Sequence, residues 1–243
     1  PKLDSLQGLF VPAPRSRHWA RLWDEVTGYP EWFGARGDDV TAASDNRAAI
    51  EACIKLCPVT QLGPLAYHVV DTLRIGVSNR TVRGSGLSIE APYDGGTRIV
   101  SSNPKKDVIH IGGTGPDARP AIIRVQEITA TWSVDLIPPP AGRESDAPAA
   151  FRVTHVLAAH LERCFALNPL VGFRFNGIIN SRCIGFGVTR FKRYGGHDFL
   201  RGVWVQGRPR LFAGGNASLY LVDGNVTTNM ALRSTLHRPM GVL

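Results

Sequence analysis

The chain has 243 residues and a mass of 26.4 kDa; 43% of the residues are hydrophobic, 20% are charged, and 26 are glycine and 17 proline. This composition excludes a disordered chain, which would be poorer in apolar residues, and a collagen-like or low-complexity chain, which would be richer in glycine and proline. The formal charge of +8 and the pI near 9.7 come mostly from scattered arginines, so the sequence predicts a basic globular protein of one large domain or two small ones.

Four further classes of protein are not expected from this sequence. No segment approaches the roughly 20 apolar residues of a membrane-spanning helix, and no basic segment followed by an apolar run marks a secretory signal. The four cysteines are too few for a disulfide framework, and Cys53 and Cys57 lack the second ligand pair of a zinc site. We therefore expect no membrane insertion, no metal and no cofactor.

The first 30 residues predict an irregular arm for attachment or docking. Pro12, Pro14 and Pro30 prevent a continuous helix, and a short apolar group around Trp19 offers a face for docking.

Residues 44–57 predict the one convincing helix of the sequence. Ser44 or Asp45 suits the N-cap, and Pro58 ends the helix. Ala49, Cys53 and Leu56 lie along one face at helical spacing.

The rest of the sequence predicts short β-strands. Gly, Asn, Asp or Ser falls between nearly every pair of extended runs, and helical crossovers are absent. The runs are 67–70, 80–82, 97–100, 108–111, 122–125 and 151–154, with later strand centres at Phe173, Ile184, Val203 and Leu219.

The spacing of the later runs discriminates between a sandwich, a closed barrel and a solenoid. Segments 162–165, 181–184, 202–205 and 219–222 follow each other at about 20 residues, the period of one coil of a parallel β-solenoid. Roughly eight coils of about 22 residues, stacked about 4.8 Å apart, would form a rod about 40 Å long. Because an open end of such a stack needs a cover, the helix at 44–57 is expected to cap the first coil.

A specific motif lies between the arm and this helix. Residues 29–40 read Tyr-Pro-Glu-Trp-Phe-Gly-Ala-Arg-Gly-Asp-Asp-Val, and the helix with Ala48-Ala49-Ile50 and the stretch Leu65-Ala66-Tyr67 follow. This order resembles the opening of the pectate-lyase-like right-handed parallel β-helix of bacteriophage tailspike proteins. The family usually has a Pro-x-Gly-x-Tyr turn where this chain reads Pro64-Leu65-Ala66-Tyr67. The resemblance is strong over about 30–110 and looser to 230.

The fold class expected is therefore all-β: a right-handed, single-stranded parallel β-helix with an N-terminal capping α-helix. Gly34 and Gly37 would permit the chain reversal between arm and cap, while Trp32 and Phe33 would seal the end of the stack. The expected organisation is a docking arm at 1–30, a cap segment at 31–58, β-helix coils at 59–232, and at 233–243 a tail or the start of a continuation, so that the sequence reads as the N-terminal portion of a longer spike.

The resemblance implies a homotrimeric phage virion protein, assembled in the host cytoplasm and placed on the tail. Its partners would be a bacterial surface polysaccharide and, through residues 1–30, tail or baseplate proteins. In many relatives the polysaccharide is cleaved by hydrolysis or β-elimination, with the active site in central coils or between subunits. Such a site can lie outside a chain of this length.

Candidate site residues come from the later coils, where side chains one coil apart can meet on the same face. Asp198, Asp223 and Glu162 are the candidate acids and bases of a glycoside hydrolase, and a lyase would need a base and a cation for a uronate. The candidate substrate-binding residues are Arg190, Arg193, Tyr194, His197 and Trp204. For each acid the structural alternative is a turn residue, and for Trp204 it is packing within the stack.

The proline-rich segment 132–148 is too polar to form a coil and is expected to protrude, where it could line a glycan groove or contact another virion protein.

Three functions compete at this point. The first is a tailspike that binds and depolymerises a capsule, exopolysaccharide or O-antigen, and the second is a non-catalytic virion adaptor or stem. The third, a bacterial pectin or rhamnogalacturonan enzyme, is disfavoured by the missing secretion signal. Nucleic-acid binding is not expected, because basic residues interleaved with aromatics cluster only at 190–194 and near 15–21.

Overall fold

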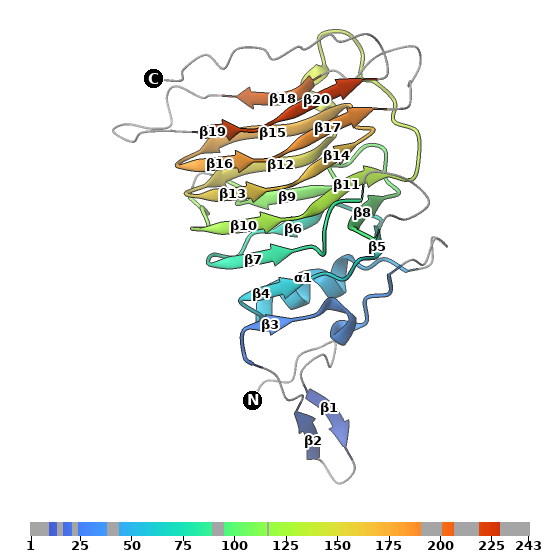
Figure 1. Cartoon of the computed structure of the whole chain (residues 1–243), viewed down its shortest axis with the longest axis vertical. Helices are drawn as coiled ribbons and strands as arrows, with labels where there is room; N and C mark the ends of the chain where they lie inside the picture. Colours follow the sequence, from blue (N-terminus) through green and yellow to red (C-terminus); the bar gives the residue numbers. More distant parts are fainter. Residues whose placement is uncertain are drawn as a thin grey trace.

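The structure is a computed structural model of the whole chain, and it describes residues 10–13, 17–20, 24–37, 44–88, 95–115, 117–190, 201–206 and 219–228. Apart from an antiparallel hairpin of β1 (Phe10–Ala13) and β2 (Arg17–Ala20), every pairing between the described strands is parallel. Successive coils stack from β3 near the N-terminus to β20 (Figure 1). The protein is a parallel β-helix, as predicted.

Three parallel sheets form the faces of the β-helix. The first sheet contains β3 (Thr27–Gly28), β4 (Val59–Gln61), β7 (Arg80–Arg83), β10 (Ile123–Gln126), β13 (Ala159–Glu162), β16 (Ser181–Ile184) and β19 (Leu219–Val222). The second contains β5 (Ala66–Val69), β8 (Thr97–Ser101), β11 (Ile128–Trp132), β14 (Phe165–Leu167), β17 (Gly187–Arg190) and β20 (Asn225–Thr228). The third contains β6 (Leu73–Ile75), β9 (Ile109–Gly112), β12 (Ala149–Val156), β15 (Val171–Ile178) and β18 (Arg201–Gln206).

The chain visits the three sheets in turn, so three consecutive strands make one coil. The described residues form five such coils, from β4 to β18, and the first two strands of a sixth. The described residues thus form fewer coils than the roughly eight expected. Phe151 pairs with Phe173, 22 positions later, but Thr81 pairs with Arg124, 43 positions later, because loops at the corners lengthen most coils.

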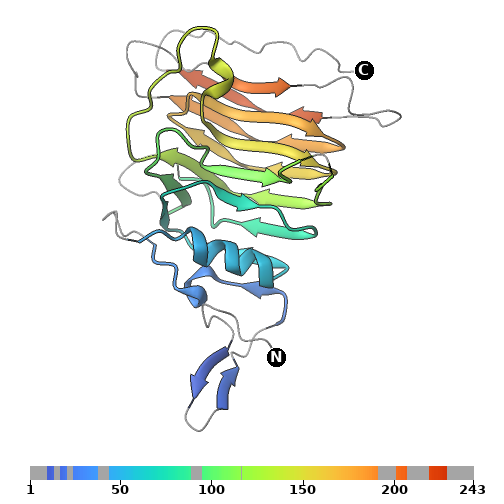
Figure 2. The ribbon, with the colours of Figure 1, turned by 180° about the vertical axis from the view of Figure 1, so that it is seen from behind.

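The predicted cap is present as α1 (Arg47–Leu56), which follows the short 3-10 helix η1 (Pro30–Phe33). After β3, η1 and α1 replace the strands of the other two sheets, and α1 contacts β4 and β6 (Figures 1 and 2). Gly34 makes the reversal after η1 with φ of 94°, and Phe33 is buried, as expected. Neither Ser44 nor Asp45 is the N-cap, because the helix begins one residue later and Asn46 has this position. The Asp45 carboxylate accepts the backbone N–H of Arg47.

The buried face of α1 differs in part from the predicted one. Ala49 and Cys53 are buried as expected, but Leu56 is 40% exposed, and Ile50 and Ile54 fill the interface instead. The other side of α1 also supplies a hydrogen-bond acceptor to the open strand edge, because Glu51 Oε1 accepts the backbone N–H of Arg74 on β6 at 2.9 Å. The cap thus covers both the apolar end of the interior and part of the open strand edge.

The interior is a column of apolar side chains. The rings of Phe151 and Phe173 stack at 4.8 Å between centroids, and Phe186 meets Phe173 edge-on at 5.3 Å. Cys164 and Cys183 are fully buried, and burial raises the pKa of the Cys164 thiol to about 12. These two thiols are therefore protonated and unreactive, as structural cysteines are.

Corners of the β-helix repeat one backbone conformation. Glu127, Arg163, Gly185 and Asp223 follow successive strands of the first sheet, and all have positive φ, between 48° and 61°. The backbone N–H of Arg163 donates to Ile184 O at 2.8 Å, and that of Gly185 donates to Val222 O at 2.9 Å. Neighbouring coils are thus joined at the corners as well as along the strands.

Candidate functional site

A basic ladder runs along the outer face of the third sheet. Arg74 on β6 pairs in register with His110 on β9, His110 with Arg152 on β12, and Arg152 with Arg174 on β15. Each is flanked along its strand by two buried apolar residues, as in Ile109-His110-Ile111, so the alternation of a strand turns all four outward. Since neighbouring strands lie about 4.8 Å apart, three guanidinium groups and one imidazole occupy consecutive levels of the stack.

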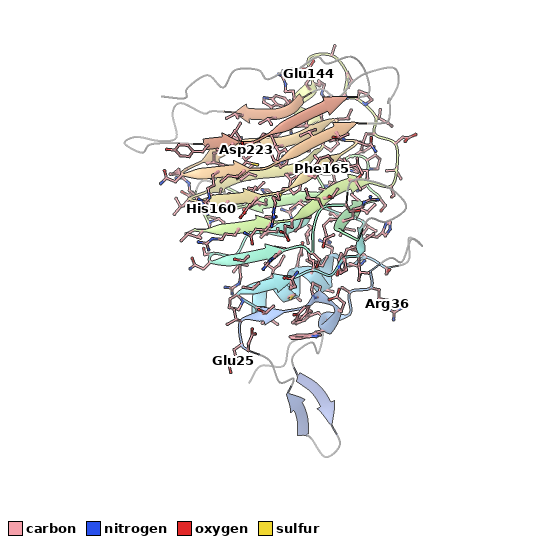
Figure 3. The ribbon with its side chains drawn as sticks, viewed as in Figure 1. Glu25, Arg36, Glu144, His160, Phe165 and Asp223 are labelled. Atoms are coloured by element: carbon pink, nitrogen blue, oxygen red, sulfur yellow. The ribbon has the colours of Figure 1, made fainter. Side chains whose placement is uncertain are left out.

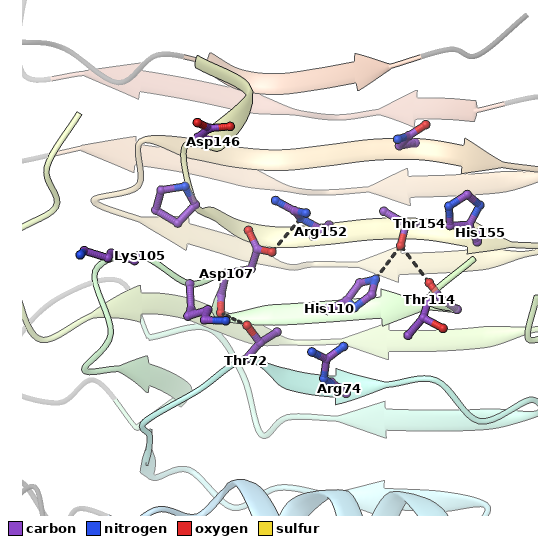
Figure 4. Close-up of a pocket in the computed structure, with 14 residues that line it drawn as sticks. Thr72, Arg74, Lys105, Asp107, His110, Thr114, Asp146, Arg152, Thr154 and His155 are labelled. Carbon is purple, nitrogen blue, oxygen red and sulfur yellow. Dashed lines mark hydrogen bonds and ion pairs between the residues drawn. The ribbon is translucent and has the colours of Figure 1, made fainter. Parts of the chain in front are cut away.

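A polar pocket of about 480 Å³ lies over this ladder (Figure 4). Three strands supply its floor, through Arg74, His110 and Arg152, and the segments before β9 and before β12 supply its walls. The other lining residues are Thr72, Lys105, Lys106, Asp107, Gly113, Thr114, Asp146, Pro148, Thr154, His155 and Asn176. Four Lys and Arg residues and two Asp residues line the pocket, so it favours an anionic ligand.

An ion pair and hydrogen bonds hold Asp107 in the wall of the pocket. Its carboxylate lies 2.7 Å from Nε of Arg152 and also accepts the backbone N–H of Ala149 at 2.8 Å. The Asp107 carbonyl accepts the Thr72 hydroxyl at 2.9 Å. Arg74, on the other side of His110, makes no ion pair with any described residue. The free cationic charge of the floor therefore lies at Arg74, while that of Arg152 is partly neutralised.

The ring of His110 is oriented by a threonine hydroxyl. The Thr154 hydroxyl oxygen lies 2.5 Å from Nε2 of His110 and 3.2 Å from the carbonyl oxygen of Gly113. In one tautomer of His110 this oxygen accepts from Nε2–H, and in the other the hydroxyl donates to Nε2.

The pKa of His110 is lowered from 6.5 to about 4, first by burial and then by the positive charges of Arg74 and Arg152. The imidazole is therefore uncharged at neutral pH. A neutral imidazole between two cations accepts a proton once an anion offsets those cations.

This pKa shift predicts a pH-dependent stability. Between about pH 6.5 and about pH 4 the unfolded chain carries a proton on this imidazole that the folded chain lacks. The free energy of unfolding should therefore fall as the pH drops through this window, by up to about 3 kcal/mol from His110. Urea denaturation at several pH values should show a smaller loss for His110→Gln than for the wild type. Equal losses in both proteins would contradict the assignment.

The segment 133–148 forms one wall and is held by a buried arginine. Arg174, 3% exposed, donates to the carbonyls of Ser145 and Ala147 at 3.0 and 2.8 Å. Its guanidinium also lies 4.6 Å from the ring centroid of Trp204. The segment's outer part is exposed, with Ile137 at 74%, while Asp146 and Pro148 line the pocket. The proline-rich segment is therefore exposed, as expected, and its last residues line the pocket, while a contact of this segment with a glycan or with another virion protein stays a prediction.

The candidate residues chosen from the sequence do not line this pocket where the structure describes them. One of them, Asp223, is labelled in Figure 3. Glu162 is at the exposed end of β13, on the first sheet, where it accepts Gln126 Nε2 at 2.8 Å. Asp223 is an exposed corner residue. Trp204 is on the outer face of β18, where Arg174 and Arg201 both approach its ring at 4.6 Å. Its ring is therefore already in contact with two cations.

The remaining candidates are not placed. Arg190 ends β17, and only its backbone is described. Arg193, Tyr194, His197 and Asp198 lie outside the described residues. The pairing of Asp198 with Asp223 therefore stays a prediction, as does the role of Arg190.

Sequence reasoning missed Arg74, His110 and Arg152. Their partners on the next strand are 36 and 42 positions away, so the expected spacing of about 20 residues does not bring them together. A signal was nevertheless present, because each residue is the polar centre of an apolar triplet, Leu-Arg-Ile, Ile-His-Ile or Phe-Arg-Val.

A second Arg-His-Arg ladder lies on the outer face of the first sheet. Arg124 on β10 pairs with His160 on β13, and His160 pairs with Arg182 on β16. The pKa of His160 is lowered by burial and by both arginines. None of these three residues lines the pocket. This ladder therefore provides matched control positions for the first.

Among the described residues, no group of three or more His, Cys, Asp or Glu side chains is arranged to hold a metal ion. In the same part of the chain, no helix has the length and apolar character needed to cross a membrane.

No protein-family model matches the sequence, and no curated protein is significantly similar to it. Solved structures with a similar fold include the ORF18 protein of Geobacillus virus E2, with a TM-score of 0.46 and 12% identity over 84% of this chain and 49% of that one. The enzymatically active domain of tailspike protein 2 of bacteriophage CBA120 has a TM-score of 0.40 and 13% identity, over 92% of this chain and 37% of its own. The tailspike protein of Acinetobacter baumannii phage AM24 has a TM-score of 0.34 and 12% identity, over 96% and 49%.

The chain spans less than half the length of each of these three structures. The β-helix itself is established by the register of its parallel strands.

Proposed function

We propose that this chain is part of a phage tailspike and binds an acidic bacterial surface polysaccharide in the pocket over Arg74, His110 and Arg152. The observation that carries the proposal is the ladder itself, three basic side chains held in register under a recessed pocket. A rigid sheet holds these groups in place before the ligand arrives, which reduces the entropy lost on binding. A pocket of this size accommodates a short segment of a sugar chain.

The tailspike role is supported by the resemblance of residues 29–40 to tailspike openings and by the capped β-helix that follows them. On the same resemblance we propose a virion tail location, a homotrimer and attachment through residues 1–30.

Depolymerisation of the bound polysaccharide is the finer part of the proposal. Hydrolysis requires two available carboxyl groups across the bound sugar. In the pocket, Asp107 is paired with Arg152, and Asp146 with Arg143 at 2.8 Å. The described pocket therefore suits recognition of an anion better than hydrolysis by a carboxyl pair. The same observation favours the second candidate function, a non-catalytic adaptor or stem of the spike.

Replacing Arg74 by alanine is expected to weaken binding of an acidic polysaccharide about 10- to 100-fold. The reason is that the floor of the pocket loses the cation that would form a charged hydrogen bond with the ligand. Calorimetry with alginate, hyaluronan and polygalacturonate, and with dextran as the neutral polymer, measures this change. Affinity should also decrease with added salt.

Arg124→Ala is the matched control, since Arg124 has the same place in an apolar triplet on another face. Equal weakening by both variants would show attraction to net charge alone, which contradicts a site at the pocket. If none of the acidic polymers binds more tightly than dextran, the binding proposal is wrong, and the adaptor function is favoured.

A further inference from the structure

We propose that copies of this chain associate through the corner between the third and first sheets, with Ile122 and Leu157 at the centre of the contact. This inference rests on the homotrimer of the proposed function, because it names the surface that such a trimer buries. The corner ridge, as we call this surface, consists of the three residues before each of β7, β10, β13 and β16, which are 77–79, 120–122, 156–158 and 178–180.

The corner ridge is continuous along the stack. Backbone hydrogen bonds join its successive levels, with donors and acceptors Asn79 and Ala121 at 2.9 Å, Leu157 and Pro120 at 3.1 Å, and Ile179 and Val156 at 3.0 Å. Since neighbouring coils lie about 4.8 Å apart, the four levels span about 14 Å along the stack. A partner that lies alongside the stack can therefore contact all four levels at once.

The exposed part of the corner ridge is apolar and uncharged. Ile122 is 38% exposed and Leu157 is 40% exposed, and Val77 and Ile179 are half-buried. No Lys, Arg, Asp or Glu occurs among the residues of the ridge, and its polar members are uncharged. Apolar side chains grouped in this way, with polar ones beside them, are typical of a protein interface.

Ile122 has a backbone conformation that costs free energy. Its φ is 51°, in the left-handed region that β-branched residues rarely adopt. The equivalent residues before β7 and β16 are Asn79 and Asn180, with φ of 58° and 46°, and asparagine adopts this conformation at little cost. Ile122 thus exposes an apolar side chain and strains the backbone where asparagine would do neither. Burial of Ile122 against another molecule gives this strained position a function.

The distribution of charge favours a second copy of the chain as that molecule. Both sheets that meet at the corner ridge have a basic ladder, around His110 on one and His160 on the other, and the chain has a formal charge of +8. About a rotation axis parallel to the stack, each residue near the axis meets the same residue of the other copies. A ladder would then face identical cations, whereas Ile122 would face an apolar side chain. The corner ridge avoids this repulsion between copies.

The other two corners are less suitable for such a contact. The three residues before the strands of the second sheet include Glu127, Arg163 and Asp223, and those before the strands of the third sheet include Asp71 and Lys106. Charged residues are depleted at the buried centre of protein interfaces. The corner ridge therefore suits a contact between copies better than either of them.

The test measures the mass and the association of the protein in solution. In sedimentation velocity over a series of concentrations, the wild-type protein should reach three times the chain mass of 26.4 kDa. Ile122→Asn should raise the dissociation constant about 10-fold or more, because the interface loses an apolar side chain at its centre. Leu157→Asn should weaken association in the same way.

A stability measurement separates an interface role from a folding role. At concentrations where both proteins are monomers, Ile122→Asn should unfold at the same urea concentration as the wild type or at a higher one, because asparagine relieves the strain at this corner. A lower urea midpoint for the Ile122→Asn monomer would mean that Ile122 serves the fold itself, and the inference would be wrong.

Ile137→Asn is the matched control, because it makes the same change at a side chain that is 74% exposed in the segment before β12. It should leave the dissociation constant unchanged. Weakening as large as that of Ile122→Asn would show that surface hydrophobicity in general, and not the corner ridge, drives association.

The remaining outcomes distinguish this inference from the proposed function. A wild-type protein that stays a monomer at every concentration disproves the corner ridge and the homotrimer, while calorimetry with the acidic polymers still decides the binding proposal. A trimer that neither ridge variant weakens assembles through another face, which disproves the inference alone. A dimer that both variants dissociate supports the corner ridge and disproves the homotrimer.

Discussion

Replacing Phe173 by alanine is expected to lower the free energy of unfolding by about 3–5 kcal/mol, the usual effect of removing a buried aromatic ring. Phe173 is fully buried; its ring stacks on that of Phe151 on the neighbouring strand, lies beside that of Phe175 on its own strand, and makes a T-shaped contact with Phe186. Its removal leaves a cavity that rigid neighbouring coils cannot close. Urea denaturation followed by circular dichroism measures the change.

Two further variants test the cause. Phe173→Leu fills most of the space and should cost less than Phe173→Ala. Tyr220→Ala removes a ring that is 64% exposed and should change stability by less than about 0.5 kcal/mol. A similar loss for Phe173→Ala and Tyr220→Ala would mean that the column of rings does not stabilise the stack.

Replacing Gly112 by alanine is expected to cost at least about 3 kcal/mol, because it combines backbone strain with a clash. Gly112 has φ of 117°, a conformation that favours glycine, and an added Cβ would overlap the carbonyl oxygen of Thr154. Gly112 also pairs with Thr154, so any shift moves the hydroxyl that orients His110. Both stability and polysaccharide binding should decrease.

Gly142→Ala is the control that measures the cost of backbone strain without a steric clash. Gly142 has φ of 81°, but nothing lies within 4 Å of an added Cβ, so only the strain of a positive φ remains. Its expected cost is about 1–2 kcal/mol. Equal costs at the two positions would show that the close approach of β9 and β12 does not matter.

The β-helix could be predicted because the alternation of apolar and polar residues in its strands is visible in the sequence. Triplets such as Leu-Arg-Ile and Phe-Arg-Phe alternate around one outward side chain, and residues 29–40 give the resemblance to a capped β-helix. The number of coils could not be predicted, since a corner tolerates insertions of any length without disturbing the strands. The segment before β12 alone adds 16 residues, 133–148, to one coil.

The site could not be predicted for the same reason. Which outward residues become neighbours depends on register, and loops of different lengths separate Arg74, His110 and Arg152 along the sequence. The expected acids were chosen from the later coils at a fixed spacing. The pocket is instead formed by the earlier coils, where the intervals are longest.

The corners of the β-helix have a consequence for how such a protein can change. Insertions enter at corners and alter the rim of the pocket, as segment 133–148 does, while the ladder keeps its place because each strand is fixed by its neighbours in the stack. The lengths of the corner loops and the residue types of the ladder can therefore vary independently. Under the proposed function, a lineage with this scaffold would change its preferred sugar by exchanging a single loop, while the residues of the ladder stay the same.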